Sequence, residues 1–320
     1  FAHLRAEIGR AMVGQGEIID GVLSCLFCGG NCLLEGVPGL GKTMLVRAIA
    51  SALELKFSRI QFTPDLMPAD IIGTRIIHED EHGKRALIFQ PGPIFSQIIL
   101  ADEVNRATPK TQSALLEAMQ EHSVTVGDTT HHMAEPFFVL ATQNPIEMEG
   151  TYPLPEAQLD RFMMKHLVRR SSREELSEVL ARTTEGVRIE INKVMDGGRI
   201  REWQELVRQV VIAPEVRDYA VRLVLATHPG SEFATPLVDK YVKFGASQRG
   251  AQGLVLAGKC RALMLGRYNV SFGDLRELTL PCLRHRIILN FEAEAEGIQS
   301  DSIIAEMLDK LPESAVMAKA

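Results

Sequence analysis

The stretch GVPGLGKT at residues 36–43 constrains the fold more than any other part of the chain. It fits the pattern G-x-x-x-x-G-K-[ST] at every fixed position, and it lies between a predicted strand and a predicted helix, which is the context that the pattern requires. In such a loop, glycines let backbone N–H groups point at phosphate oxygens, and the helix N-terminus adds partial positive charge. The stretch therefore predicts a phosphate-binding loop rather than a glycine-rich turn without a ligand.

Each position of the loop has an expected role. Lys42 is expected to reach the β- and γ-phosphates of a nucleoside triphosphate, and the Thr43 hydroxyl is expected to bind Mg²⁺. The other loop positions expected to contact the phosphates are Gly36, Pro38, Gly39, Leu40 and Gly41.

Polar side chains end two further apolar runs. Residues 98–103 (IILADE) end in Asp102 and Glu103, and residues 136–144 (PFFVLATQN) end in Asn144. Asp102 is expected to hold Mg²⁺ through water, Glu103 to polarise the attacking water, and Asn144 to orient that water. Two acids after a strand are also typical of a helix N-terminus, and Asn before Pro is also a turn former. Beside a phosphate loop, the catalytic interpretation is favoured.

Short apolar runs alternate with helical patterns in the first half of the chain, which predicts an α/β fold with a parallel sheet covered on both faces. The predicted strands are residues 31–36, 55–62, 96–103, 136–144 and 162–170. Two insertions, residues 73–93 and 121–136, each predict a pair of short strands around a polar turn.

The composition changes at RRSSREE, residues 169–175, and helical periodicity dominates after it, with little sign of strands. We therefore expect a core domain at residues 1–170 and a helical domain at residues 171–320. The expected helices of the second domain are residues 173–182, 200–211, 214–227, 237–245, 251–266, 272–290 and 301–311.

Bulk composition narrows the class of protein. The 320 residues carry 35 Lys and Arg against 41 Asp and Glu, which is not the charge balance of a general nucleic-acid binder. No apolar run approaches the roughly 20 residues that span a bilayer. Five cysteines without a disulfide-scaffold pattern favour a reducing compartment, so we expect the protein in the cytoplasm.

Three of the cysteines, Cys25, Cys28 and Cys32, cluster in SCLFCGGNC. A metal or iron–sulfur site would need a fourth ligand from a distant part of the chain. The surrounding leucine and phenylalanine residues instead suit thiols that pack as small apolar groups, which is the favoured interpretation.

The stretch YPLPEAQLDRF at residues 152–162 offers a cation on a stiff support. Its two prolines fix the backbone, and the helix formers at 156–159 put Arg161 on or just past a short helix. Arg161 either pairs with Asp160 or Glu156 on a surface, or is held out for a strongly negative group.

Together, these motifs resemble the MoxR family of AAA+ ATPases over nearly all of the chain. The stretches that carry the resemblance are VGQ (13–15), LLEGVPGLGKT (33–43), QFTPDLMPADIIGT (61–74), DEVNRA (102–107), LLEAMQEHSVT (115–125), ATQNPIEMEGTYPLPEAQLDRF (141–162) and GASQRG (245–250). The resemblance implies a P-loop AAA+ core of αβα layers with a five-stranded parallel sheet, followed by an all-helical lid. The insertions at 73–93 and 121–136 would be the helix-2 insert and the presensor hairpin.

The resemblance also implies roles that spacing alone does not give. Asn144 corresponds to sensor 1, and Arg161 corresponds to the arginine finger, which meets the γ-phosphate of ATP bound to a neighbouring subunit. Arg249 corresponds to sensor 2, which reaches the γ-phosphate of its own subunit. The chain departs from the family at Gln248, where similar proteins usually carry Pro, and this difference could alter the helix start before Arg249.

Three further residues are implied as nucleotide contacts. Val13 and Gln15 correspond to part of the adenine pocket, and Thr63 is a candidate contact in the stretch QFTPDLMPADIIGT. The clustered cysteines fall where similar proteins carry ordinary small apolar residues, which weakens the metal interpretation further.

The implied function is Mg²⁺-dependent hydrolysis of ATP to ADP and phosphate by a homo-oligomeric ring, a hexamer, that remodels or activates partner proteins as a chaperone does. The implied partner carries a von Willebrand factor A domain. A DNA motor of the helicase type is an alternative, but residues 121–136 contain no Lys or Arg and residues 73–93 balance bases with acids, so neither insertion suits strand tracking. A nucleotide-gated scaffold with little turnover is a second alternative, which the full catalytic set argues against.

Overall fold

The computed structural model describes residues 1–36, 41–79, 83, 85–144, 151–184 and 190–313. Its contacts divide the chain into two compact units. The first unit comprises residues 1–20, 33–154 and 167–201, and the second comprises residues 21–32, 155–166 and 202–320.

Five strands form one sheet in the spatial order β2-β5-β8-β1-β9. They are β1 (Asn31–Glu35), β2 (Phe57–Gln61), β5 (Ile98–Asp102), β8 (Phe138–Gln143) and β9 (Phe162–Leu167). β5 pairs in parallel with both β2 and β8. β5 and β8 are buried until their last residue, as apolar strands are when helices cover both faces of a sheet. The predicted α/β fold with a five-stranded parallel sheet is confirmed.

Helices of the first unit pack through apolar stripes. In α3 (Lys42–Ala52), the buried residues Leu45, Ala48, Ile49 and Ala52 recur at helical spacing and form its inner face. The other helical segments of this unit are α1 (Ala2–Ala11), α4 (Pro68–Ile72), η1 (Pro93–Phe95), η2 (Val104–Arg106), α5 (Pro109–Glu121) and α7 (Arg173–Thr184). The division between the units runs through α2 (Gly16–Cys28) and α8 (Gly197–Gln209).

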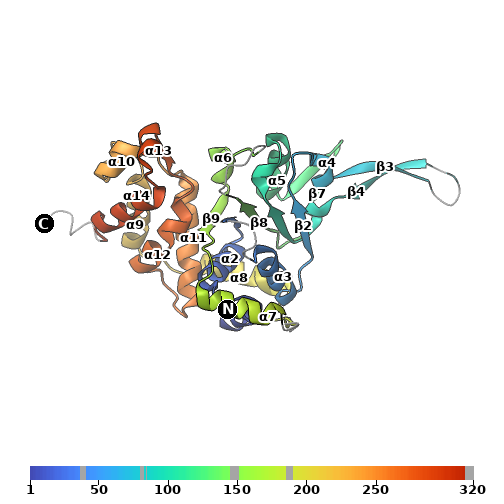
Figure 1. The fold of residues 1–320 in the computed structure, drawn as a ribbon, viewed down its shortest axis with the longest axis horizontal. Helices are drawn as coiled ribbons and strands as arrows, with labels where there is room; N and C mark the ends of the chain where they lie inside the picture. The colour runs from blue at the N-terminus through green and yellow to red at the C-terminus, as the bar shows by residue number, and fades with distance from the viewer. Residues whose placement is uncertain (37–40, 80–82, 84, 145–150, 185–189, 314–320) are drawn as a thin grey trace. The chain divides into compact units, whose positions relative to one another are not determined.

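Both predicted insertions are antiparallel ribbons, as the sequence indicated. The first ribbon joins β3 (Gly73–Glu79) to β4 (Arg85–Pro91) and projects away from the sheet (Figure 1). The second joins β6 (Ser123–Val126) to β7 (Thr129–His132) through a turn with Gly127 at φ 68°. This left-handed backbone favours glycine, so the Gly-Asp pair sets the turn.

The second unit is mostly helical. Its helices are α6 (Glu156–Leu159), α9 (Pro214–Leu225), α10 (Pro236–Tyr241), α11 (Gln248–Met264), α12 (Phe272–Leu283), α13 (Phe291–Glu296) and α14 (Ser300–Lys310). In the described part of the chain, no helix has both the length and the apolar character needed to cross a membrane.

Two predicted helices of this unit are too long, and the lid is not entirely helical. The helices expected at 237–245 and 272–290 end at Tyr241 and Leu283. The residues that follow form a small antiparallel ribbon of β10 (Val242–Phe244) and β11 (Ile288–Leu289). The chain leaves the second helix because His285 and Arg286 turn inward to contact carbonyl oxygens of β9.

All five cysteines are free thiols buried in the second unit. Burial raises the pKa of Cys25 well above its usual value and raises the pKa of Cys282 to about 12. A hydrogen bond with Cys260, together with burial, raises the pKa of Cys28. Cys25, Cys28 and Cys282 therefore stay protonated at neutral pH, and the buried thiols pack as small apolar groups.

The contact division and the sequence-based division differ at α7. Contacts assign α7 to the first unit, where Arg182 donates to the Arg10 carbonyl oxygen at 2.7 Å. The sequence placed the same helix after a boundary at residue 170. That domain boundary remains a prediction.

Candidate nucleotide-binding site

The predicted phosphate loop joins β1 to α3, and the structure describes both of its ends. The residues between them, 37–40, lie outside the described part, and with them the predicted contacts Pro38, Gly39 and Leu40. Gly36 donates its N–H to the Gln143 carbonyl oxygen at 3.2 Å, which fixes the start of the loop beside the end of β8. Gly41 has φ 76° and ψ 12°, a left-handed conformation that favours glycine, and it opens α3. The N-terminal amides of α3 are therefore held next to the carboxyl end of the sheet.

Lys42 lies among acids. Its Nζ donates to the Gly36 carbonyl oxygen at 2.6 Å, so the side chain folds back over the loop. Burial lowers the pKa of Lys42, while the carboxylates of Asp102, Glu103 and Glu35 act in the opposite direction. The fold thus brings the phosphate-loop lysine within electrostatic reach of the two acids predicted from a separate motif.

Asp102 ends β5 and is held from both neighbouring strands. Its Oδ1 accepts from the Thr142 hydroxyl at 2.7 Å. Its Oδ2 accepts from Arg59 Nη2 at 2.7 Å and from Arg59 Nε at 3.1 Å. The carboxylate is only 14% exposed, so its direction is set by these partners.

Glu103 follows Asp102 but takes a different direction. Its φ of 56° and ψ of 49° are left-handed, which is uncommon for a residue with a side chain and is often found at functional sites. Its N–H donates to the Thr142 hydroxyl at 2.8 Å. Its carboxylate accepts from Gln61 Nε2 at 3.0 Å and from Arg106 Nη1 at 2.9 Å. One threonine hydroxyl therefore fixes both acids.

Asn144 follows β8 and is fixed through its backbone. Asn105 Nδ2 donates to the Asn144 carbonyl oxygen at 3.2 Å, and the Asn144 N–H approaches Asn105 Oδ1 at 3.5 Å. Asn105 is 5% exposed and belongs to the η2 turn that begins after Glu103. The amide predicted to orient water is thus tied to the segment that carries the predicted base.

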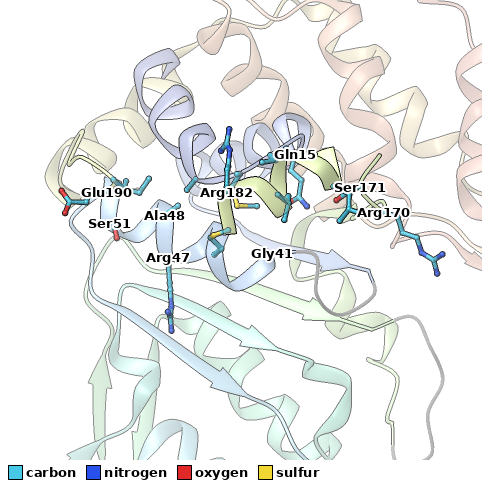
Figure 2. Close-up of a pocket in the computed structure, with 16 residues that line it drawn as sticks. Gln15, Gly41, Arg47, Ala48, Ser51, Arg170, Ser171, Arg182 and Glu190 are labelled. Atoms are coloured by element: carbon cyan, nitrogen blue, oxygen red, sulfur yellow. The ribbon is translucent and has the colours of Figure 1, made fainter. Parts of the chain in front are cut away.

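A cavity of about 1030 Å³ opens beside α3 in the first unit (Figure 2). Its lining includes Val13, Gln15 and Gly41, the three residues of this region that the sequence assigned to the nucleotide. Met44 and Leu176 add apolar surface. A large, mainly apolar hollow with a few polar groups suits a nucleotide base.

The oxygen donors of the site fit Mg²⁺. Thr43 and Asp102 provide a hydroxyl and a carboxylate, and Mg²⁺ is usually bound by one or two carboxylates together with waters and substrate phosphates. Among the described residues, no group of three or more His, Cys, Asp or Glu side chains could hold a metal ion. At Thr43 and Asp102, Mg²⁺ would be held together with phosphate oxygens of the nucleotide.

The two predicted arginines belong to the second unit. Arg161 is half-buried and lies two residues beyond α6, as the sequence indicated. Arg249 is in the first turn of α11, where its N–H donates to the Ser247 hydroxyl at 3.1 Å. This cap lets the helix begin at Gln248, so the departure from the family pattern leaves a regular helix start.

Sequence reasoning missed the residues that hold the site together. Three of them lie within three residues of a predicted site residue, in the stretches ATQNP and DEVNRA: Thr142, Asn105 and Arg106. Their place in these motifs could have indicated a role in the site. Arg59 carried no such signal, because its contact with Asp102 depends on β2 lying beside β5. Thr63, the remaining predicted contact, lies just beyond β2, and its carbonyl oxygen accepts from the Leu66 N–H at 3.1 Å.

Comparison with family models defines the class of protein. Residues 31–164 match the ATPase family associated with various cellular activities (AAA), and residues 235–307 match the AAA lid domain. The chain is thus an AAA ATPase core followed by a lid. The residues between the two matches, 165–234, include α7 and α8.

Relatives narrow the class to one family. The chain is 42% identical to Chaperone MoxR1 of Mycobacterium tuberculosis, over 94% of this chain and 79% of that protein. It is 43% identical to YeaC of Bacillus subtilis (94% and 91%) and 30% identical to Protein MoxR of Methylorubrum extorquens (95% and 92%). A crystal structure from Cytophaga hutchinsonii superposes with a TM-score of 0.89 at 43% identity, over 97% of this chain and 94% of that one. The chain belongs to the MoxR family of AAA+ ATPases.

Proposed function

We propose that this protein hydrolyses ATP to ADP and phosphate with Mg²⁺. Lys42 and the amides at the start of α3 bind the phosphates, and Thr43 and Asp102 hold Mg²⁺, which offsets the charge on the phosphate oxygens. Glu103 takes the proton of the attacking water, which Asn144 orients. The proposal is supported above all by Thr142, whose hydroxyl holds both acids within electrostatic reach of Lys42.

The nucleotide base is proposed to lie in the cavity lined by Val13, Gln15 and Gly41. Thr63 remains a candidate contact. Arg249 acts as sensor 2 on the γ-phosphate of the same subunit.

Arg161 is proposed to act on the ATP of a neighbouring subunit in a homo-oligomeric ring, a hexamer. Its guanidinium is planar and stays charged at any working pH, so it can stabilise phosphate oxygens as the phosphoryl group leaves. An arginine finger is worth about 10³–10⁵ in rate in other phosphoryl-transfer enzymes.

Phosphate release from mixed subunits tests this proposal. Lys42→Ala protein should be inactive, and Arg161→Ala protein should keep only the residual turnover left after a loss of about 10³–10⁵-fold. In a mixture, a subunit with intact Lys42 can sit beside one with intact Arg161, so activity should return once mass or fluorescence shows subunit exchange. Absence of recovery at every mixing ratio, in rings proven to be mixed, would contradict action in trans. Turnover by the single variants equal to the parent would contradict the site itself.

The partner is proposed to be a protein, which the ring remodels or activates. On the β3–β4 ribbon, Ile77 and Leu87 are paired across the strands and are 70% and 67% exposed. Exposed apolar side chains that lie together in this way are typical of a surface that contacts another protein. A protein with a von Willebrand factor A domain is the candidate that the family suggests, and capture with an ATP-locked Glu103→Gln ring tests it.

The charges of the ribbons disfavour a DNA motor. Arg75 pairs with Asp128 of the second ribbon, and Arg85 pairs with Glu79 at 2.9 Å, so both arginines are already neutralised by acids. Salt-dependent binding of single- or double-stranded DNA would revive that alternative. ATP binding without steady phosphate release would instead favour the nucleotide-gated scaffold.

A further inference from the structure

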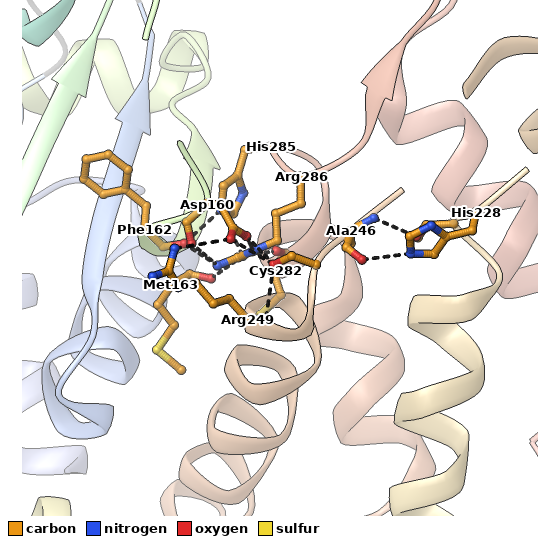
Figure 3. Close-up of polar contacts among 11 residues, drawn as sticks. Asp160, Phe162, Met163, His228, Ala246, Arg249, Cys282, His285 and Arg286 are labelled. Carbon is orange, nitrogen blue, oxygen red and sulfur yellow. Dashed lines mark hydrogen bonds and ion pairs between the residues drawn. The ribbon is translucent and has the colours of Figure 1, made fainter. Parts of the chain in front are cut away.

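The carboxylate of Asp160, next to Arg161, is the centre of a polar network inside the second unit (Figure 3). Its Oδ1 accepts from Arg286 Nε at 2.8 Å. The Ser247 hydroxyl lies 2.8 Å from both of its oxygens, and Arg249 Nη1 lies 3.6 Å from Oδ2. One carboxylate thus links the segment of the proposed finger to the start of α11 and to the turn after α12.

Arg286 holds the backbone on both sides of Arg161. Its Nη2 donates to the Asp160 carbonyl oxygen at 3.1 Å and to the Phe162 carbonyl oxygen at 2.7 Å. Its Nη1 donates to the Met163 carbonyl oxygen at 3.1 Å. A guanidinium is planar and presents its donors in a fixed fork, so one rigid group brackets the backbone from which the Arg161 side chain extends.

Stability alone explains this arrangement poorly. The Arg286 side chain is 3% exposed and that of Asp160 is 18% exposed, so a charge pair has been taken largely out of water. Buried pairs often stabilise a protein no more than apolar residues of similar volume would. What the pair supplies, and an apolar contact would not, is a fixed direction for the chain.

The two arginines at Asp160 are not equivalent. Arg286 is buried and close, whereas Arg249 is 48% exposed and 3.6 Å away. Gly250 leaves room for Arg286, because a Cβ at position 250 would lie only 3.1 Å from Arg286 Cδ. Arg286 is therefore the closer and more deeply buried of the two partners of Asp160.

We infer that Asp160 and Arg286 are positioning residues for Arg161, which they hold in the geometry needed at the γ-phosphate of a neighbouring subunit. The inference rests on the proposed function, because it takes Arg161 as a finger acting in trans. A misplacement of about 1 Å can cost about 10²-fold in rate. Asp160→Asn should therefore lower kcat about 10²-fold and leave ATP affinity unchanged.

Mixed rings show on which side of the interface Asp160 acts. If Asp160 positions the finger, an Asp160→Asn subunit still has an intact nucleotide side, so mixing with Lys42→Ala should restore activity. Mixing with Arg161→Ala should not, because both proteins then lack a working finger side. The reverse pattern would mean that Asp160 acts through Arg249 on its own nucleotide. Recovery with neither, in rings where Lys42→Ala and Arg161→Ala do restore each other, would mean a general structural role. Either result would overturn the inference.

Two further comparisons separate this inference from the proposed function. In an Arg161→Ala background, Asp160→Asn should cause no additional loss of turnover, and this holds whether Arg161 acts in cis or in trans. An additional loss of about 10²-fold would overturn the positioning role. If the mixture of Lys42→Ala and Arg161→Ala fails while this background test succeeds, action in trans is wrong and the positioning of Arg161 stands.

Asp301→Asn is a matched control. Asp301 pairs with Arg284 at 2.8 and 3.0 Å in the same unit, and neither residue contacts the backbone of residues 160–163 in a described hydrogen bond. Its turnover should equal that of the parent, whatever its effect on the melting temperature. If Asp160→Asn does not fold, Arg286→Lys keeps the charge but loses the fork, and kcat should again fall with ATP affinity unchanged. Parental kcat in a folded Arg286→Lys protein would overturn the inference.

Discussion

Replacing Thr142 by valine tests whether one hydroxyl holds Asp102 and Glu103, the two acids proposed to act in catalysis. Thr142 is fully buried, and its Oγ1 donates to Asp102 and accepts from the Glu103 N–H. Valine has nearly the same shape, so the change removes both hydrogen bonds and leaves the part-buried Glu103 N–H without this partner. A buried donor left unpaired costs about 1–3 kcal/mol, and a lost hydrogen bond to a charged group costs about 1.5–3 kcal/mol.

The added methyl group returns about 1 kcal/mol of burial, so Thr142→Val should lower the free energy of unfolding by about 3 kcal/mol. Released from Thr142, the two carboxylates should shift, and kcat should fall about 10²-fold if the shift approaches 1 Å. Denaturant titration measures the first effect, and steady-state phosphate release measures the second.

Thr142→Ser is the matched control. Serine keeps the hydroxyl and loses one buried methyl group, so the free energy of unfolding should fall by only about 1 kcal/mol and kcat should stay near that of the parent. Equal kcat for the valine and serine variants would refute the claim that the hydroxyl sets the geometry of Asp102 and Glu103. Equal free energies of unfolding for the valine variant and the parent would refute the claim that the two hydrogen bonds of Thr142 stabilise the fold.

Three further outcomes are expected. Arg249→Ala should lower ATP turnover, and scattering should show a weaker ATP-dependent change in the position of the lid; parental values for both would mean a surface role. Serine at both Ile77 and Leu87 should change the free energy of unfolding by less than about 1 kcal/mol, because both side chains are exposed. This variant should keep ATP turnover but lose suppression of light scattering by a heat-unfolded reporter protein, and unchanged suppression would count against the ribbon as a protein contact. Burial and the charge of Arg284 lower the pKa of His166 to about 4 from an ordinary value of 6.5, so the unfolded chain takes up a proton that the folded protein does not. This residue alone should therefore lower the free energy of unfolding by about 2 kcal/mol between pH 7 and 5. The pKa of His285 is lowered as well and adds to the decline, so His166→Gln should remove about 2 kcal/mol of it and leave the rest, and an unchanged pH profile would contradict the assignment.

The sequence was sufficient for features set by local pattern. The five strands and both ribbons were predictable because apolar runs and turn residues lie next to each other in the chain. The position of Asp102 and Glu103 near Lys42 was predictable for a related reason, since parallel strands deliver their last residues to one edge of a sheet.

Features set by distant partners were not predictable. The helix expected at 272–290 continues in pattern, but it ends at Leu283 because His285 and Arg286 bond to carbonyl groups of β9. The contact of Arg59 with Asp102 likewise depends on the order of strands in the sheet. The hydrogen bonds from Arg286 to the backbone around Arg161 could not be predicted from the sequence pattern, because Arg286 and Asp160 are separated by more than a hundred positions.

The most direct test of the central claim measures ATP binding and phosphate release side by side for the parent, Lys42→Ala and Glu103→Gln. Lys42→Ala removes the ammonium from the phosphates and should weaken binding and abolish release. Glu103→Gln keeps the shape of the side chain but is a poor base, so it should bind ATP as the parent does and release almost no phosphate. Parental phosphate release by folded Glu103→Gln, or parental ATP affinity and release by folded Lys42→Ala, would contradict the proposed site of ATP hydrolysis.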